Sequence, residues 1–530
     1  MIDTPGRPRT CLPDWDEAEL PAPEPLSWRH WTRFIGPGIV MMGIQIGGGE
    51  WLLGPEVTAR YGGGLMWIAT IAIVLQVFYN LECGRYALYC GEPVFTGFLR
   101  TRPGPRFWMG AILFLNLSAL IPGLSTHGAA MAAALWLDRP PGEGDRALVT
   151  GLAYVFLLAV ALPVLVGGKV YNVLQAIMTA KVAVVLGFCL VVGVLFVTPS
   201  NWWNVFSGFA KFGTVPTVID GRQATVNVVQ HWWSEGTWPA IDLGNIVVLG
   251  AFAGYAGGGG LANATYGNFV RDKGWGMGRT VGAIPSAVGG RHVTLSHIGK
   301  VFIINPENLR RWRGWWRYVL VDQIYVWAPG CFMGMALPAL LSLQFAPYSG
   351  LRGANLEWAQ SLITADGIRH APAFTATAGK LMWIVTVFVG LMVMLPSQMS
   401  IVDDFSRRWT DLLWSGSRRI RESMSGNAVK RIYYSILASY VLWTMVCASL
   451  FSTYGTPKLM TLVIANINNL AIGLTAFHLL WINCRLLPTE LRPRWYQRAG
   501  LVACGVFYLG IAMLVFATKQ WPMLKHLIGL

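Results

Sequence analysis

Charged residues are scarce in this sequence. They make up 13% of its 530 residues, whereas 54% are hydrophobic, and the mean hydropathy is +0.47. A soluble protein of this size carries roughly a quarter charged residues. The charges are also unevenly placed, because long charge-free stretches alternate with short basic ones. This composition excludes an ordinary soluble domain and is typical of a chain that has the bilayer as its solvent.

The sequence also lacks the motifs of several function classes. It has no HExxH, GxSxG or paired CxxC motif, and His292 and His297 lie five apart, off one helical face, so we expect no enzyme and no cofactor. The 8 cysteines form no disulfide framework. No basic-aromatic pattern indicates nucleic acid as a partner. The first 33 residues have no apolar h-region, which predicts a tail and not a signal peptide.

What the sequence does contain is a series of long apolar segments. Each has about 20 residues or more, enough to cross a bilayer as a helix. They are residues 34–56, 62–82, 107–136, 147–167, 170–199, 243–270, 317–345, 379–402, 432–454, 457–483 and 499–518. The predicted fold class is therefore an all-α polytopic membrane protein of about 11 transmembrane helices, surrounded by membrane lipid.

The basic residues predict the orientation. Most of the 41 Lys and Arg fall in the N-terminal tail and in every second loop, beginning with the loop between segments 2 and 3. By the positive-inside rule these parts are cytoplasmic, so we expect an inner (plasma) membrane protein with its N-terminus inside and its C-terminus outside. The net charge of +15 is thereby explained by topology and not by nucleic acid.

Two glycine clusters are the main functional feature. Segment 1 contains GIQIGGGEWLLGPE from Gly43, and segment 6 contains GYAGGGGLANATYG from Gly254. The clusters lie five segments apart, in segments 1 and 6, so the two segments cross the membrane in opposite directions. This predicts a 5+5 inverted repeat with one span appended. The predicted organisation is a tail (1–33), a first repeat (34–199), an extracytoplasmic loop (200–242), a second repeat with a long cytoplasmic 6–7 loop (243–483), and the last span with the C-terminus (484–530).

Runs of glycine interrupt helices, because each costs about 1 kcal/mol of helix propensity relative to alanine. Paired interruptions in corresponding halves indicate a transporter's substrate site, although small residues also allow close helix packing. We therefore predict that helices 1 and 6 are discontinuous. The predicted substrate-binding residues are Gln45, Gly47, Gly48, Gly49, Glu50, Gly257, Gly258, Gly259, Gly260 and Asn263.

Glu50 follows the first cluster at mid-membrane depth, where an ionised carboxylate is costly without a partner. It has three open roles: a cation or metal ligand, the carrier of a coupling proton, or a cap for its own half-helix. Thr265 and Asn268, after the second cluster, are further candidates for lining the cavity.

Three further sites are weaker candidates. His127 in segment 3 is a candidate proton relay, or else a neutral histidine bonded to a neighbouring helix. Ser397 and Ser400 in segment 8 offer hydroxyls for a possible second ion site. Asp403 and Asp404 at the end of that segment are expected to form a solvated charge cluster or an inner-gate contact.

The order of these features resembles the Nramp (natural resistance-associated macrophage protein) metal-ion transporters over most of residues 34–494. The resemblance includes IGPG at 35–38, ECGRY at 82–86 with GE at 91–92, and SRRW at 406–409. The string IGGGEWLLGP in segment 1 is similar to a divergent branch of that family. The resemblance implies a LeuT-like fold with broken first and sixth helices and alternating access to a central site.

The chain departs from the family at the metal ligands. The Asp-Pro-Gly-Asn motif falls on Gly47, Gly48, Gly49 and Glu50, and the Met-Pro-His motif falls within glycines 257–260. Soft ligands favour transition metals, whereas oxygen ligands suit hard ions. The predicted function is thus a secondary transporter of a small substrate, such as magnesium. The alternatives are an ion-coupled transporter of a small organic solute, or a non-transporting sensor or complex subunit.

Overall fold

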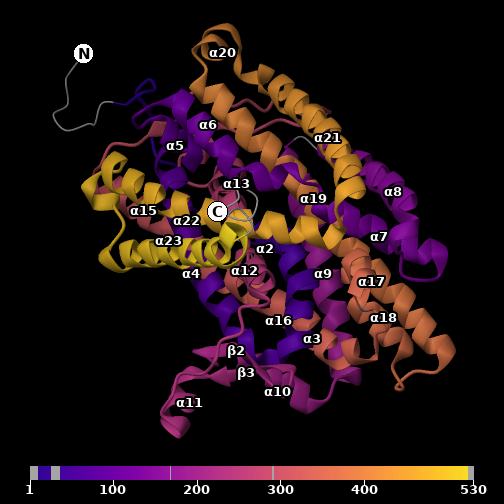
Figure 1. The fold of residues 1–530 in the computed structure, drawn as a ribbon. Helices are drawn as coiled ribbons and strands as arrows, with labels where there is room; N and C mark the ends of the chain where they lie inside the picture. The colour runs from indigo at the N-terminus through magenta and orange to yellow at the C-terminus, as the bar shows by residue number, and fades with distance from the viewer. Residues whose placement is uncertain (1–9, 26–35, 167–168, 289–291, 352, 523–530) are drawn as a thin grey trace.

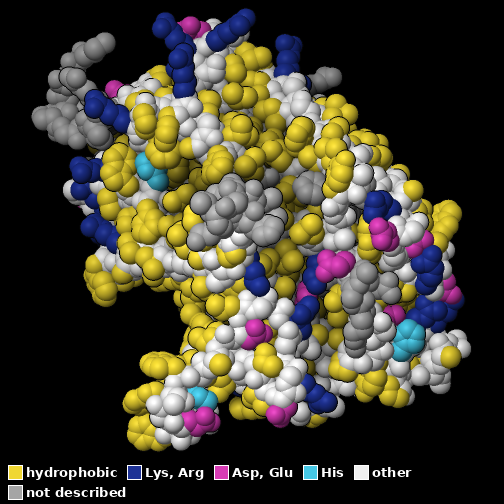
Figure 2. Space-filling model, in the orientation of Figure 1, with side chains coloured by type: hydrophobic (Ala, Val, Ile, Leu, Met, Phe, Trp, Pro, Cys, Tyr) yellow, Lys and Arg dark blue, Asp and Glu magenta, His cyan; other side chains and the backbone are white. Residues whose placement is uncertain are grey.

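The chain forms a bundle of apolar helices. The computed structural model describes residues 10–25, 36–166, 169–288, 292–351 and 353–522, which are mostly helical (Figure 1). Ten helices among these residues are long and apolar enough to cross a membrane. Hydrophobic side chains cover much of the face seen in Figure 2, and many Lys and Arg lie toward its edges. The chain is a multi-pass membrane protein, and the predicted all-α fold class is confirmed.

The first five predicted segments form helices with several interruptions. Segment 1 is divided among three pieces, so it is not one of the ten long helices. The elements of this half are α2 (Pro37–Gln45), the π-helix η2 (Gly49–Leu53), α3 (Gly54–Tyr61), η3 (Gly62–Leu65), α4 (Trp67–Cys90), α5 (Val94–Leu99), α6 (Pro105–Leu115), η4 (Leu117–Leu120), α7 (Gly123–Leu137), η5 (Glu143–Asp145), α8 (Arg146–Ala159), η6 (Pro163–Leu165) and α9 (Val170–Phe196).

The second half also contains interrupted helices. Its membrane elements are α12 (Ile246–Tyr255), η7 (Gly260–Ala264), α13 (Thr265–Lys273), α15 (Pro306–Val321), the π-helix η8 (Asp322–Trp327), α16 (Ala328–Phe345), α19 (Ala376–Gly416), α21 (Val429–Tyr454), α22 (Pro457–Leu486), α23 (Trp495–Val515) and η13 (Phe516–Gln520). Between them lie the short elements α14 (Gly278–Val281), η9 (Ala346–Tyr348), α17 (Gly353–Ala359), η10 (Gln360–Leu362), α18 (Ile363–His370), α20 (Arg418–Ser423), η11 (Gly426–Ala428) and η12 (Thr489–Leu491).

Two predicted segments differ from the structure. The third, expected as one helix over 107–136, is interrupted between α6 and α7, where Pro122 cannot donate a backbone hydrogen bond. The eighth, expected to end at residue 402, continues to Gly416. At 1.5 Å per residue, the 41 residues of α19 span roughly 60 Å, about twice the hydrocarbon core.

The predicted loop 200–242 is folded. It contains α10 (Pro199–Gly208), a hairpin of β2 (Thr214–Ile219) and β3 (Arg222–Asn227), and α11 (Val228–Glu235). Asp220 and Gly221 both have positive φ, as a two-residue hairpin turn requires. These elements lie together at one end of the bundle, here named the hairpin end (Figure 1).

The predicted N-terminal tail is docked where it is described. Its strand β1 (Asp16–Glu17) pairs in parallel with β4 (Lys300–Val301) of the 6–7 loop. Beside it, Arg100 and Glu92 form a buried ion pair at 2.5 Å. Arg100 also donates to the Pro13 carbonyl oxygen, and Glu92 accepts from the Gly299 amide. The tail is thus bound to two loops.

The division into repeats at the stated boundaries stays a prediction.

Candidate functional site

Segments 1 and 6 are both interrupted, and their interruptions lie against each other. The backbone leaves the helix after Gln45, where Ile46 has a ψ of 82°, and η2 begins at Gly49. Segment 6 breaks between Tyr255 and Gly260. A Cβ at Gly49 would lie only 2.2 Å from the Tyr255 carbonyl oxygen, so the two breaks touch through their backbones. The predicted discontinuity of both helices is confirmed.

The glycines of the two clusters act differently. In segment 6, Gly257, Gly259 and Gly260 have φ values of +84°, +74° and +60°, which side chains with a Cβ rarely adopt. The glycines 47–49 have no positive φ, and they serve close approach instead. Gly49 abuts Tyr255, as described above. Glycine therefore permits the break in segment 6 and the close contact in segment 1.

Gln76 of α4 supplies partners for the backbone groups that the segment 6 break frees. Its Nε2 donates to the Ala256 carbonyl oxygen at 2.7 Å. Its Oε1 accepts from the Gly258 amide at 2.7 Å and from Asn263 Nδ2 at 3.0 Å. Gln76 is fully buried. Sequence reasoning did not single it out, although a lone glutamine in an apolar segment was the available signal.

A cavity of about 80 Å³ lies beside the two breaks. Seven elements border it, namely α2, η4, α7, α12, η7, α19 and α22, and one side is the interruption between α6 and α7 that the sequence did not predict. Its polar and glycine lining consists of Gln45, Gly48, Asn116, Ser118, Gly123, Tyr255, Gly257, Gly258, Gly259, Ser397, Asp404 and Asn468. The other predicted substrate-binding residues, which do not line it, are Gly47, Gly49, Glu50, Gly260 and Asn263.

Glu50 lies behind the cavity and is fully buried. Its Oε2 accepts a hydrogen bond from the Gly47 amide at 3.2 Å. Gly47 lies in the break and Glu50 lies in η2, so this bond caps the start of the half-helix that contains Glu50. Its Cγ faces Gly334 of α16. Within the described part of the chain, Oε1 has no hydrogen-bond partner. Gln45, on the other side of the break, accepts from Trp327 Nε1 and from Cys331 Sγ.

The remaining candidates lie in separate places. His127 Nε2 contacts Thr461 Oγ1 at 3.0 Å between α7 and α22, outside the cavity lining. Ser400 donates to the carbonyl oxygen of Ser397 in its own helix at 2.6 Å. Ser397 instead reaches the end of α2, where its hydroxyl donates to the Ile44 carbonyl oxygen at 3.2 Å. The Lys181 ammonium donates to Ser397 Oγ.

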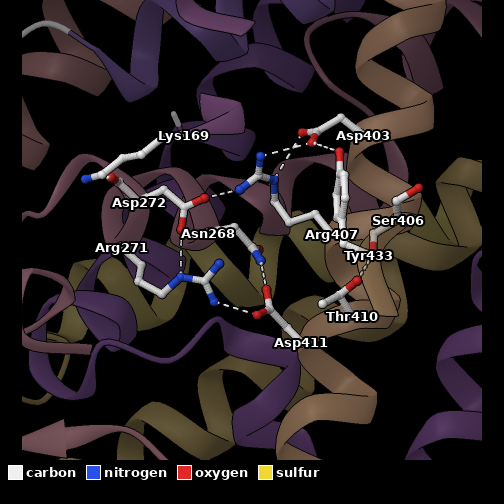
Figure 3. Close-up of polar contacts among 10 residues, drawn as sticks. All are labelled: Lys169, Asn268, Arg271, Asp272, Asp403, Ser406, Arg407, Thr410, Asp411 and Tyr433. Atoms are coloured by element: carbon white, nitrogen blue, oxygen red, sulfur yellow. Dashed lines mark hydrogen bonds and ion pairs between the residues drawn. The ribbon is translucent and has the colours of Figure 1, made fainter. Parts of the chain in front are cut away.

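A buried charge network connects α13 with α19 (Figure 3). Arg407 pairs with Asp272 and Asp403, and Arg271 pairs with Asp272 and Asp411. No side chain of the five is more than 5% exposed.

Other polar groups complete this network. Tyr433 donates to Asp403 at 2.6 Å, and Asn268 donates to Asp411 at 2.5 Å. Asp404 pairs with Arg408 at 2.6 Å and accepts from Thr265. The expectation of a solvated cluster at Asp403 and Asp404 is therefore wrong, because α19 continues and packs its charges against α13. The alternative expectation, an inner-gate contact, stays a prediction.

A second buried network lies toward the hairpin end. Glu56 of α3 pairs with Lys458 at 3.0 Å and with Arg60 at 2.6 Å, and it accepts from Gln360 at 2.6 Å. Glu56 follows the break of segment 1, whereas Asp272 follows the break of segment 6. Since these segments run in opposite directions, the two networks lie on opposite sides of the breaks.

No family model matches the sequence, and no curated protein sequence matches it. Solved structures do match the fold. The manganese transporter of Eremococcus coleocola, in complex with an aromatic bis-isothiourea substituted compound, superposes with a TM-score of 0.60 at 13% identity, covering 97% of this chain and 93% of that chain. A mutant of that transporter gives a TM-score of 0.62 at 13% identity, over 97% and 94%. The likeness confirms the LeuT-like fold.

Neighbouring glycines of segment 1 test the contact between the two breaks. In Gly49→Ala the new methyl group meets the Tyr255 carbonyl oxygen at 2.2 Å, so we expect a loss of stability of about 1–3 kcal/mol, as for overpacking. The matched control is Gly48→Ala, where the nearest atom is 3.3 Å away on the Tyr255 ring. Thermal unfolding in detergent should show a clearly larger fall in Tm for Gly49→Ala than for Gly48→Ala. Equal Tm values would contradict the backbone contact.

Arg407→Met tests the network between α13 and α19. It leaves Asp403 without its arginine partner in a buried setting, which typically costs about 3–5 kcal/mol. We expect faster hydrogen exchange in α13, measured by mass spectrometry, with α3 unchanged. Arg418→Met is the control, because Arg418 is 84% exposed and solvent screens its pair with Glu422. Unchanged exchange in α13 would show that the network does not hold this helix.

Proposed function

We propose that this chain is a secondary-active transporter of the Nramp-like type, working by alternating access in the inner membrane with its N-terminus inside. Its substrate is a small hydrophilic species, with a hydrated hard divalent cation such as magnesium as the first candidate. The observation that carries the proposal is a cavity at the junction of two broken helices, lined by polar and glycine residues together with eight apolar ones. Irregular backbone at membrane depth is tolerated only where it is buried in protein or lines such a space.

The chemistry of the cavity lining supports a hard substrate. Its side-chain polar groups are amides, hydroxyls and one carboxylate, with no thioether, thiol or imidazole in the lining. Oxygen ligands suit magnesium and calcium, whereas sulfur and imidazole select transition metals. The described residues contain no cluster of three or more His, Cys, Asp or Glu that could hold a metal ion. The lining therefore favours an ion that keeps its water over a dehydrated one.

The size of the cavity agrees with a hydrated ion. A water molecule needs about 10–15 Å³ of cavity volume, measured as the space open to the centre of a water-sized sphere. The cavity has about 80 Å³ of this volume, so it holds roughly six water molecules. Magnesium dehydrates reluctantly and usually keeps several waters in proteins. Glu50 lies behind the lining, and its Oε1 has no hydrogen-bond partner among the described residues. It is the acid to which we assign the cation or a coupling proton.

One observation favours a small organic solute as the second candidate. The only carboxylate of the lining, Asp404, is paired with Arg408, so the cavity has little net negative charge to balance a cation. Arg408 is also buried against Asn116 and the Leu261 carbonyl oxygen at the cavity edge. A guanidinium and positive half-helix ends recognise the carboxylate of a zwitterionic solute.

Flux measurements in liposomes test the first candidate. We expect saturable magnesium influx, larger than manganese influx, through the purified wild-type chain. Glu50→Gln should reduce it at least tenfold without lowering the Tm, because the amide oxygen still accepts from Gly47 and only the charge is lost. Asn468→Leu, in the cavity lining, should also reduce influx, whereas Leu474→Ala at an exposed position of the same helix should not.

The outcomes separate the candidate functions. No influx of either ion through folded wild-type protein would contradict the cation proposal. Concentrative uptake of a zwitterionic amino acid in the same liposomes would then support the organic-solute candidate. If neither is transported, the sensor or subunit alternative remains.

A further inference from the structure

Lys181 has no role in the function proposed above, yet it is buried at the centre of the bundle. It lies in the middle of α9 and is 3% exposed. An ammonium group at this depth costs several kcal/mol unless polar partners compensate it. Its Nζ donates a hydrogen bond to Ser397 Oγ of α19. The question is therefore what this positive charge stabilises.

Ser397 connects the ammonium to the break of segment 1. Its hydroxyl donates to the carbonyl oxygens of Ile44 at 3.2 Å and Ile46 at 3.4 Å. These carbonyls lie where α2 ends, and the C-terminal end of a helix carries partial negative charge on unpaired carbonyl oxygens. Carbonyls at such half-helix ends, with a nearby hydroxyl, are oxygen ligands of the kind that bind sodium in transporters with broken helices.

Glu50 places a buried carboxyl group on the other side of the same break. Its Oε2 accepts from the Gly47 amide, and a Cβ on Gly47 would lie 2.9 Å from Ser397 Oγ. Glu50 and Lys181 form no direct ion pair within the described residues, and Ser397 and the segment 1 backbone lie between them. The break thus lies between a buried acid and a buried base.

We propose that Lys181 is a built-in cation that fills the ion site between α2, α9 and α19, so that this protein binds no free sodium ion there. The second ion site expected at Ser397 is then occupied by a side chain. The inference is independent of the transported substrate, because it rests only on the contacts of Lys181 and Ser397.

Sodium-dependent hydrogen exchange tests this inference without any transported substrate. Exchange of residues 37–53 is compared in sodium chloride and in N-methyl-D-glucamine chloride at equal ionic strength. We expect no difference for the wild type. In Lys181→Ala the vacated site should take up sodium and slow exchange of this segment about tenfold at a sodium concentration of ten times Kd. Lys181→Met, which keeps the apolar stem, serves if the alanine variant unfolds.

Two further variants complete the design. Lys181→Arg keeps a positive charge at the site and should show no response to sodium. Adding Ser397→Ala to Lys181→Ala should abolish the response, because a ligand is removed. Slower exchange of the wild type in sodium would overturn the proposal. So would a lack of response in both neutral variants while folded, or a response in Lys181→Arg. Failure of magnesium transport would leave these outcomes unaffected.

Discussion

The structure depends on one constraint: backbone groups that two broken helices release inside a membrane must find partners within the protein. Gln76 meets this need for segment 6, where it bonds both the Ala256 carbonyl oxygen and the Gly258 amide. Glu50 and Ser397 meet it for segment 1, at the Gly47 amide and the Ile44 carbonyl oxygen. These partners come from three different segments, so the breaks persist only in the assembled bundle. The cavity exists because the glycines leave space beside these satisfied groups.

The buried ion pairs complete this arrangement. One network joins α13 to α19 beyond the break of segment 6, and the other joins α3 to α22 beyond the break of segment 1. Replacing a buried ion pair by apolar residues is often neutral or stabilising, so the presence of such pairs is weak evidence for stability. In a transporter that alternates between two states, two protein surfaces can separate on one side of the membrane. Charged residues on such surfaces form ion pairs in the closed state and are hydrated in the open state. The positions of the two networks therefore agree with the alternating access that we propose.

The sequence predicted the helical membrane fold and the breaks, because both follow from local composition. Consecutive glycines at 257–260 identify a break, since three of them need positive φ. The side chains that bond the backbone groups freed at the breaks could not be predicted from local composition. Gln76 and Gly258 meet only after packing, as do Lys181 and Ser397. Likewise, the charges from Asp403 onward resemble the end of a span in sequence, and their partners on α13 and at Tyr433 are met only after packing.

Substituted-cysteine accessibility in liposomes tests most directly whether the breaks enclose a water-accessible site. Ser118→Cys and Asn468→Cys place thiols in the cavity lining, and Val191→Cys places one on the lipid-facing surface of α9, where Val191 is 56% exposed. A charged, water-soluble maleimide should modify both cavity thiols, more slowly in magnesium, and should not modify the thiol at position 191. Modification of position 191 alone, or of none of the three, would contradict a polar cavity at the centre of this protein.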